Sequence, residues 1–132
     1  MTLDAIGIVC SDLQQSLSFY RTFGLTFTPM GEGQDHWEAT LPSGVRLMLD
    51  SLELIIKINP DWEQKVGGPA VLCFKQDSAE AVNKLYKNLI QDGFKGIKEP
   101  WDAFWGQRYS SVADPDGVQV DVFADLDNKN GS

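Results

Sequence analysis

Short apolar segments alternate with polar turns along this chain, and the whole pattern occurs twice. The first half begins with an apolar segment at 5–10, and the second begins with a similar one at 70–75. In each half, apolar residues at helical spacing follow, after Asp12 and after Asp77. Segments that alternate polar and apolar residues complete each half, as is typical of strands with one buried face.

The repeat is clearest in segments 44–50 and 117–123. Both begin with Gly-Val and then alternate polar and apolar residues, so that position 44 corresponds to position 117. The strands expected after the two helices are 25–30, 36–41, 45–50, 94–98, 107–113 and 118–123. This pattern predicts an α+β fold with two tandem βαβββ units. A ferredoxin-like split βαβ domain is the alternative, but it needs four main strands where the pattern gives eight.

The repeat also predicts where the parts of the chain begin and end. We expect one domain with a first unit at about 4–50, a linker at 51–69, a second unit at about 70–124 and a polar tail at 125–132. The linker contains LELIIKI at 52–58, which is apolar enough to extend a strand or to cover an interface. Gly67-Gly68-Pro69 is the expected hinge into the second unit.

Charge and composition narrow the possible partners. With 11 basic and 19 acidic residues the net charge is −8, which disfavours nucleic acid and anionic lipid. The acidity favours cationic ligands, or it serves only solubility. The start of the chain carries Asp4 and no early Lys or Arg, so it does not read as a signal peptide. Cys10 and Cys73 lie in apolar segments and make no disulfide framework, so we expect a cytoplasmic protein.

Two motifs then connect the chain to a known family. They are Asp12-Leu13 with Ser16, Phe19-Tyr20 and Gly24-Leu25, and Trp105-Gly106-Gln107-Arg108-Tyr109 followed by Asp114-Pro115-Asp116-Gly117. With these motifs the sequence resembles the vicinal oxygen chelate superfamily, which includes glyoxalase I, bleomycin resistance proteins and extradiol dioxygenases. The resemblance covers about residues 4–124. It implies that each unit forms a curled mixed sheet whose concave side holds the ligand.

The resemblance also implies where a metal would bind. Metal-using members place four ligands on the inner strands, usually two His and two Glu or Gln. The motifs align those positions with Ala5, Met48, Val71 and Asp121. Only Asp121 suits a borderline or hard divalent ion, and one carboxylate falls short of the three or four ligands that such sites require. The sequence therefore predicts no metal and no other cofactor. Because the metal is the Lewis acid in the family's enzymes, a chain without it lacks that catalytic group.

Strand alternation predicts which side chains face the concave side. The expected inward sets are Ala5, Gly7 and Val9; Arg46, Met48 and Asp50; Val71, Cys73 and Lys75; and Gln119, Asp121 and Phe123. The valines and leucines between them are expected to lie under the helices. His36, the single histidine, lies outside the family ligand set, with Glu38 two residues away.

An aromatic cluster is the remaining candidate for a binding site. Trp101, Phe104 and Trp105 fall within five residues, in an expected loop at 99–106 on the rim of the concavity. They either pack in the core or in a dimer interface, or they form an aromatic wall over a floor of Met48, Asp121 and Arg46 that holds a flat cation. Arg108 either belongs to this site or pairs with Asp114 or Asp116 to brace the turn.

The resemblance and the missing metal ligands together favour a binding protein over an enzyme. The metal-free bleomycin resistance proteins look like acidic homodimers that sequester a cationic antibiotic without changing it. We therefore expect a homodimer that binds an aromatic or cationic small molecule, such as an antibiotic, with no catalytic residue. The predicted ligand-binding residues are His36, Glu38, Arg46, Met48, Asp50, Cys73, Trp101, Phe104, Trp105, Arg108 and Asp121.

Two other functions remain open from the sequence. One is a glyoxalase- or dioxygenase-like enzyme acting on a small metabolite, in which Asp121 or Glu38 replaces the metal as a general base. The other is a ligand-sensing accessory protein. Recovery of the ligand changed or unchanged separates the enzyme from the other two.

Overall fold

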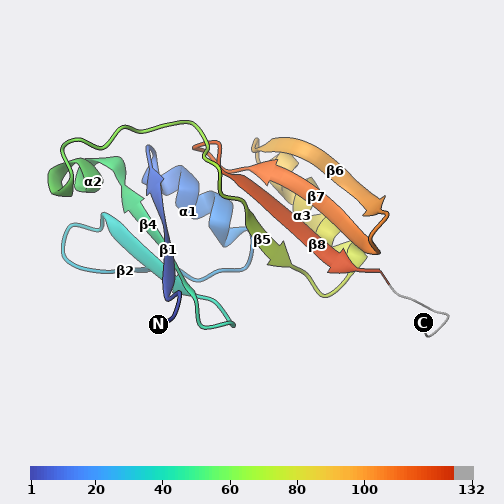
Figure 1. The fold of residues 1–132 in the computed structure, drawn as a ribbon. Coiled ribbons are helices and arrows are strands. Elements are labelled where there is room, and N and C mark those ends of the chain that lie inside the picture. The colour runs from blue at the N-terminus through green and yellow to red at the C-terminus, as the bar shows by residue number, and fades with distance from the viewer. Residues whose placement is uncertain (127–132) are drawn as a thin grey trace. The chain divides into compact units, whose positions relative to one another are not determined.

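The structure is a computed structural model that describes residues 1–126 (Figure 1). Of the predicted polar tail, residues 127–132 lie outside this part. In chain order the elements are β1 (Ala5–Cys10), α1 (Leu13–Arg21), β2 (Thr28–Pro29), β3 (His36–Thr40), β4 (Arg46–Ser51), α2 (Leu52–Ile58), β5 (Leu72–Lys75), α3 (Ala79–Gln91), β6 (Lys95–Ala103), β7 (Gln107–Ala113) and β8 (Gln119–Asp125).

Two compact units divide the chain between Val66 and Gly67. The first contains a sheet with strand order β1-β4-β3-β2, and the second a sheet with order β5-β8-β7-β6. In each sheet the first strand pairs parallel with the last, and the other pairs are antiparallel. The predicted α+β fold with duplicated βαβββ units is therefore confirmed, and two separate four-stranded sheets argue against the split βαβ alternative.

The pairing register reproduces the repeat seen in the sequence. On β3 and β4, His36 lies opposite Asp50 and Glu38 lies opposite Met48. On β7 and β8, Tyr109 lies opposite Phe123 and Ser111 opposite Asp121. Positions 36, 38, 48 and 50 thus correspond to 109, 111, 121 and 123, with the same spacing along the chain as between 44 and 117. The two hairpins are equivalent residue by residue.

One face of each sheet is buried beneath a long helix. In the first unit Leu47 and Leu49 of β4 are buried with Leu17 of α1. In the second, α3 lies along its sheet (Figure 1) and buries a stripe at helical spacing against the apolar residues of β8. That stripe consists of Val82, Leu85 and Leu89, and the residues beneath it on β8 are Val120 and Val122. Alternation then leaves the polar residues of β4 and β8 on the opposite face.

The segment 52–58 is a helix, and its prediction as an extended or edge strand is wrong. Ser51 ends β4 and caps α2, because its Oγ accepts a hydrogen bond from the Leu54 backbone N–H at 3.1 Å. Glu53 in the first turn and Lys57 in the last turn suit the helix dipole. No residue of α2 is fully buried. The apolar character of this segment therefore does not reflect a buried strand of the sheet.

The strand predicted at 94–98 is also longer than expected. It runs from Lys95 to Ala103, so Trp101 lies on β6, and the expected loop at 99–106 shrinks to a tight turn around Gly106. Pro100 is tolerated because β6 is an edge strand, and shifts of register near Lys98 absorb the irregularity. In the first unit, by contrast, only Thr28 and Pro29 of the predicted strand 25–30 pair as a strand.

The remaining sequence expectations concern membranes and thiols. Among residues 1–126, none of the helices has the length and apolar character needed to cross a bilayer. Cys10 is buried and Cys73 is exposed, and no disulfide joins them.

Candidate functional site

Most of the predicted site residues lie on the sheet face opposite the long helix in each unit. We call the set in the first unit the ionic face (His36, Glu38, Arg46, Met48 and Asp50). We call the set in the second unit the aromatic face (Trp101, Trp105, Tyr109, Asp121 and Phe123).

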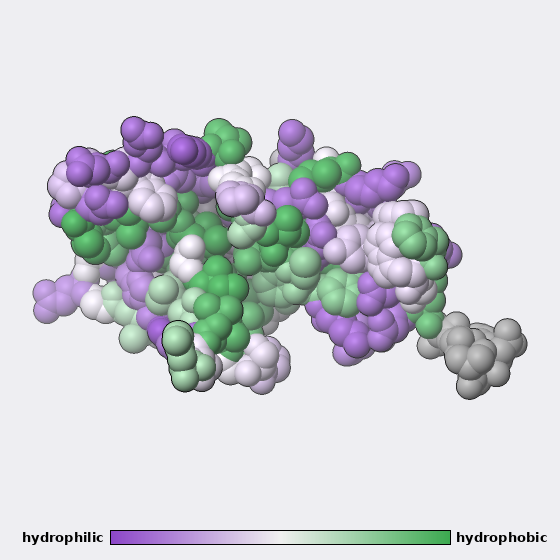
Figure 2. All heavy atoms as spheres, viewed as in Figure 1, coloured by the Kyte–Doolittle hydropathy of each residue, from purple (hydrophilic) through white to green (hydrophobic). Residues whose placement is uncertain are grey.

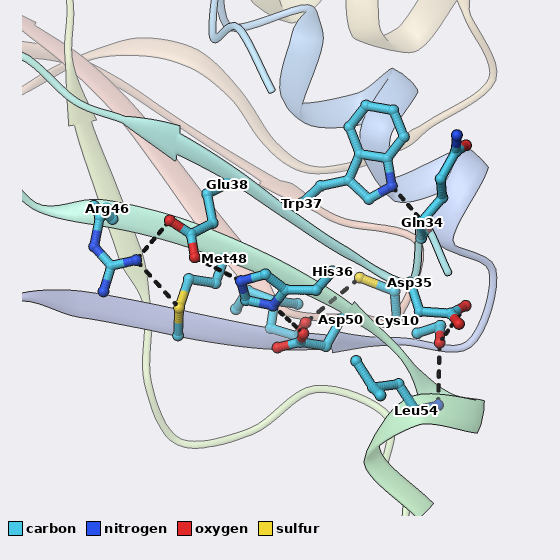
Figure 3. Close-up of polar contacts among 12 residues, drawn as sticks. Cys10, Gln34, Asp35, His36, Trp37, Glu38, Arg46, Met48, Asp50 and Leu54 are labelled. Atoms are coloured by element: carbon cyan, nitrogen blue, oxygen red, sulfur yellow. Dashed lines mark hydrogen bonds and ion pairs between the residues drawn. The ribbon is translucent and has the colours of Figure 1, made fainter. Parts of the chain in front are cut away.

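On the ionic face, the imidazole of His36 lies between two carboxylates (Figure 3). Its Nε2 is 2.6 Å from Oε2 of Glu38, two residues further along β3. Its Nδ1 contacts Oδ1 of Asp50, the residue directly opposite on β4. The three side chains are about one-quarter to one-eighth exposed, so they lie at the surface of the sheet without being fully solvated.

Arg46 extends this network to the start of the chain. Its Nη1 is 2.6 Å from Oε1 of Glu38 and 3.9 Å from the sulfur of Met48 (Figure 3). Its Nη2 is 2.7 Å from Oδ2 of Asp4, just before β1. Charged side chains thus link the segments of β1, β3 and β4 across one face. Asp4 was not predicted as a site residue.

The pKa values follow from this geometry. Partial burial lowers the pKa of His36, but the hydrogen bonds and negative charges of Glu38 and Asp50 outweigh it and raise the pKa above 6.5. Hydrogen bonds from His36 and Arg46 lower the pKa of Glu38 below its usual value. The ionic face therefore favours the protonated form of His36 and the ionised form of Glu38.

On the aromatic face, four rings contact one another in series. Trp101 meets Trp105 edge to face at 5.6 Å between ring centroids, and Trp105 meets Tyr109 at 5.4 Å. Tyr109 stacks on Phe123 at 5.7 Å, with 17° between the ring planes. These residues come from β6, the β6–β7 turn, β7 and β8, so the aromatic face extends over three adjacent strands of one sheet.

Part of this wall is open to solvent. Trp105 is 48% exposed and Phe104, which packs on it at 4.9 Å, is 92% exposed. Figure 2 shows pale and green side chains at the end of the second unit where the β6–β7 hairpin turns. The cluster is therefore not a buried core, and the interpretation of these rings as interior packing does not hold for Phe104 and Trp105.

Asp121 lies at the buried end of the aromatic face. Its Oδ2 accepts a hydrogen bond from the Tyr109 hydroxyl at 2.7 Å. Its Oδ1 accepts from the Ser111 hydroxyl at 2.7 Å and from the Gln119 amide at 3.0 Å. Burial, and then the neighbouring carboxylate, raise the pKa of Tyr109, so its hydroxyl stays a donor. Cys73 on β5 lies opposite Asp121, and it makes a smaller contribution to the raised pKa of Tyr109.

Comparison with known proteins identifies the family of this chain. The model of the Glyoxalase/Bleomycin resistance protein/Dioxygenase superfamily matches residues 2–122. The chain belongs to this superfamily. Among curated proteins, none matches the chain.

Solved structures of similar proteins agree with the superfamily fold. A glyoxalase-related enzyme from Fulvimarina pelagi aligns with a TM-score of 0.79 and 19% identity, over 94% of this chain and 88% of that one. A glyoxalase/bleomycin resistance protein/dioxygenase from Nocardioides aligns with a TM-score of 0.72 and 24% identity, over 100% and 88%. A family enzyme from Burkholderia phytofirmans aligns with a TM-score of 0.77 and 19% identity, over 96% and 100%.

The positions aligned with the superfamily's metal ligands do not fit a metal here. Ala5 and Val71 carry no donor atom, and the thioether of Met48 accepts from Arg46. Asp121 is an oxygen donor, but both of its oxygens already accept hydrogen bonds. Within residues 1–126, no three His, Cys, Asp or Glu side chains come together in a group that could hold a metal ion.

Arg108, a predicted ligand-binding residue, contacts side chains of β6 and α3. Its Nε contacts Oδ1 of Asp102 at 2.5 Å and its Nη1 contacts Oδ1 of Asn83 on α3 at 2.9 Å. Because Tyr109 points to the aromatic face, its neighbour on β7 points toward the helix side. Asp114, one of the two partners that the alternative prediction gave to Arg108, accepts from backbone N–H groups in its turn.

The structure thus divides the remaining predicted site residues between the two faces. His36, Glu38, Arg46, Met48 and Asp50 contact one another in the first unit; Cys73, Trp101, Phe104, Trp105 and Asp121 lie together in the second. Sequence reasoning missed Tyr109 and Ser111, two of the three donors to Asp121. The repeat held the signal, because Tyr109 occupies the position in the second unit that His36 occupies in the first.

Proposed function

We propose that this protein binds an aromatic or cationic small molecule, such as an antibiotic, without a metal ion and without changing it chemically. The observation that carries the proposal is the aromatic face, where partly exposed rings adjoin a buried carboxylate. Aromatic walls with a few directed polar groups are typical of small-molecule sites. Membership of the superfamily supports this proposal, because the resemblance implies a curled sheet whose concave side holds the ligand.

The charge of Asp121 favours a cation as the ligand. The residue is 7% exposed, and its three hydrogen-bond donors, Tyr109, Ser111 and Gln119, are all neutral. In the described part of the chain, no Lys or Arg forms an ion pair with it. A planar cation on the rings would gain from their negative faces and from this carboxylate together.

The donor set supports binding without a metal. Two of the four family ligand positions carry no donor, and the remaining two side chains are engaged by neighbours. Elemental analysis of protein purified without chelators tests this part. We expect no stoichiometric divalent ion; one equivalent per chain that is lost in Asp121→Ala would refute it.

A carboxylate base is the enzymatic alternative, and the contacts make both candidates poorly available. Glu38 is held by His36 and Arg46, which lower its pKa and so weaken it as a base. Asp121 has a hydrogen bond on each oxygen. A base that must take a proton from a substrate would first have to release these donors.

A thermal-shift screen with matched compounds tests the binding proposal. The panel pairs planar aromatic cations with neutral and anionic aromatics of similar size, because a ligand that binds only the folded state raises the melting temperature. We expect the cations to give the largest shifts and to be recovered unchanged by mass spectrometry. Repeated conversion of a bound compound to a product would support the enzymatic function in place of the binding function.

We also propose that the protein is a homodimer. Each sheet ends in two edge strands, and such edges are usually covered in native proteins. On α2, Ile56 and Ile58 are exposed, and a helix with exposed isoleucines is a plausible contact surface. Light scattering at micromolar concentration checks this. We expect about twice the chain mass of 14.7 kDa, and a strictly monomeric mass would contradict it.

A further inference from the structure

The position of His36 between two acids has a chemical consequence that the proposed function does not use. Its Nε2 lies 2.6 Å from a Glu38 oxygen, and its Nδ1 contacts an Asp50 oxygen. Carboxylate oxygens that are ionised can only accept hydrogen bonds. Both ring nitrogens must therefore donate, and only the imidazolium, with a proton on each nitrogen, can do this.

A neutral imidazole cannot keep the same contacts. It has one N–H, and its other nitrogen presents a lone pair. In the observed geometry that lone pair would face a carboxylate oxygen at hydrogen-bond distance, which is repulsive. Loss of the proton must therefore break the contact with either Glu38 or Asp50.

We propose that His36 is a proton-operated latch of the first unit. With its proton, the ring ties β3 to β4 through Glu38 and Asp50 and neutralises part of their charge. Without its proton, one tie opens and the ionic face becomes more negative by one charge. The face would thus change both its closure and its charge over a pH range near neutrality, where histidine is the side chain that ordinarily titrates.

The other charged groups near His36 in the described part of the chain have partners of their own. Arg46 is the other cation on the face, and it already bonds Glu38 and Asp4. Asp35, the residue before His36, accepts from the Ser51 hydroxyl at 3.0 Å. The paired neighbour β2 consists of Thr28 and Pro29 and carries no titratable side chain.

The side-chain contacts of His36 also lie beside backbone hydrogen bonds at the start of β3. The His36 carbonyl accepts from the Met30 N–H at 2.8 Å, and the Asp35 carbonyl accepts from the Ser51 N–H at 2.8 Å. These bonds hold both ends of the turn that leads into β3. Release of the ring from Asp50 would remove the side-chain tie beside them.

The first test uses the fact that the chain has a single histidine. An NMR titration of the imidazole carbons in the full-length protein then reports His36 without assignment by mutation. We expect a pKa above 6.5, and a lower value in Glu38→Gln and in Asp50→Asn. Glu32→Gln, which removes the same charge from an exposed turn residue, is the matched control and should leave the pKa nearly unchanged.

Hydrogen exchange then separates a latch from a histidine that merely titrates. As the pH rises through the measured pKa, protection factors of the β3 and β4 amides should fall about fivefold or more. The equivalent amides of β7 and β8, which lack a histidine, should keep theirs. In His36→Gln this pH dependence should vanish.

Two results would overturn the proposal: a wild-type pKa at or below 6.5, or protection of β3 and β4 that does not change across the titration. Neither result depends on any ligand, so the latch and the proposed function fail independently.

Discussion

The two units contain equivalent hairpins whose side chains differ in chemical character. At equivalent positions of the repeat, His36 is replaced by Tyr109 and Asp50 by Phe123. In the first unit the pair is ionic, a histidine against a carboxylate. In the second it is a stack of two rings. The backbone register is unchanged, so the difference arises from side chains alone.

Glu38 and Asp121 lie on non-equivalent strands of the two hairpins. In the first unit Glu38 lies on β3 opposite Met48; in the second Asp121 lies on β8 opposite Ser111. Glu38 is paired with cations, whereas Asp121 is held by neutral donors. The carboxylates of the ionic face have cationic partners within their own unit, whereas Asp121 has hydrogen bonds only from neutral side chains.

The faces under the helices should behave alike in both units, and this prediction has the largest effect. Leu49 and Val122 are equivalent positions of the repeat, and both are buried. Leu49→Ala should lower the free energy of unfolding by about 2–5 kcal/mol, because it leaves a cavity beneath α1. Val122→Ala should cost somewhat less, in proportion to the smaller volume removed. Chemical denaturation measures both; a loss below about 1 kcal/mol in Leu49→Ala would contradict this core.

Removal of one donor should test the hydrogen-bonded acid of the second unit. Tyr109→Phe keeps the ring stack on Phe123 but leaves Oδ2 of Asp121 without its hydroxyl partner. We expect a loss of about 1–3 kcal/mol in the free energy of unfolding, since the acceptor is a buried carboxylate. Tyr86→Phe on α3 makes the same chemical change away from this face. Equal losses in the two variants would argue against a special role for the Asp121 contact.

The aromatic face, and not the indoles in general, should bind a planar cation. Trp105→Ala should weaken the binding of an ethidium probe by about tenfold, since stacking and cation–π contacts contribute roughly 0.5–2 kcal/mol. Trp62→Ala in the first unit is the control, because that indole is similarly exposed, at 40% against 48%. Quenching of tryptophan fluorescence measures the affinity. Equal weakening by both variants would remove the aromatic face as the site.

The ionic face should make stability depend on pH, with the smallest effect. Because the pKa of His36 is raised in the folded state, its stabilisation is complete below the unfolded value of 6.5 and is lost as pH rises through the folded pKa. The loss should be about 1 kcal/mol or less, since the side chain is partly exposed. Denaturation at pH 6 and pH 9 measures it. His36→Gln should show a smaller difference between these two pH values than the wild-type protein.

Much of the fold could be predicted from the sequence, because it depends on periodic patterns. The alternation at 44–50 and 117–123 placed Leu47 and Val120 under the helices and Met48 and Asp121 on the opposite face, and burial confirms this for the two apolar residues. The spacing of the sequence repeat appears again in the sheet register. Both signals are local, since strand alternation and turn residues act within a few positions.

The contacts of the candidate site could not be predicted in the same way. Nothing in the sequence says that His36 meets Asp50 or that Tyr109 donates to Asp121, because these partners come from different strands whose register only the folded sheet defines. The contact of Arg108 could not be predicted for the same reason, since its partner Asn83 belongs to a helix 25 residues earlier.

The sequence by itself determined the duplicated units, the faces of the central strands and the lack of a metal-binding ligand set at the family's positions. Only the tertiary structure decided that residues 52–58 form a helix, that Trp101 lies within a strand, and that the two faces satisfy their charges differently. The physical reason is range. Hydrophobic periodicity and turn chemistry are written along the chain, whereas ion pairs and hydrogen bonds between side chains depend on which strands the fold brings together.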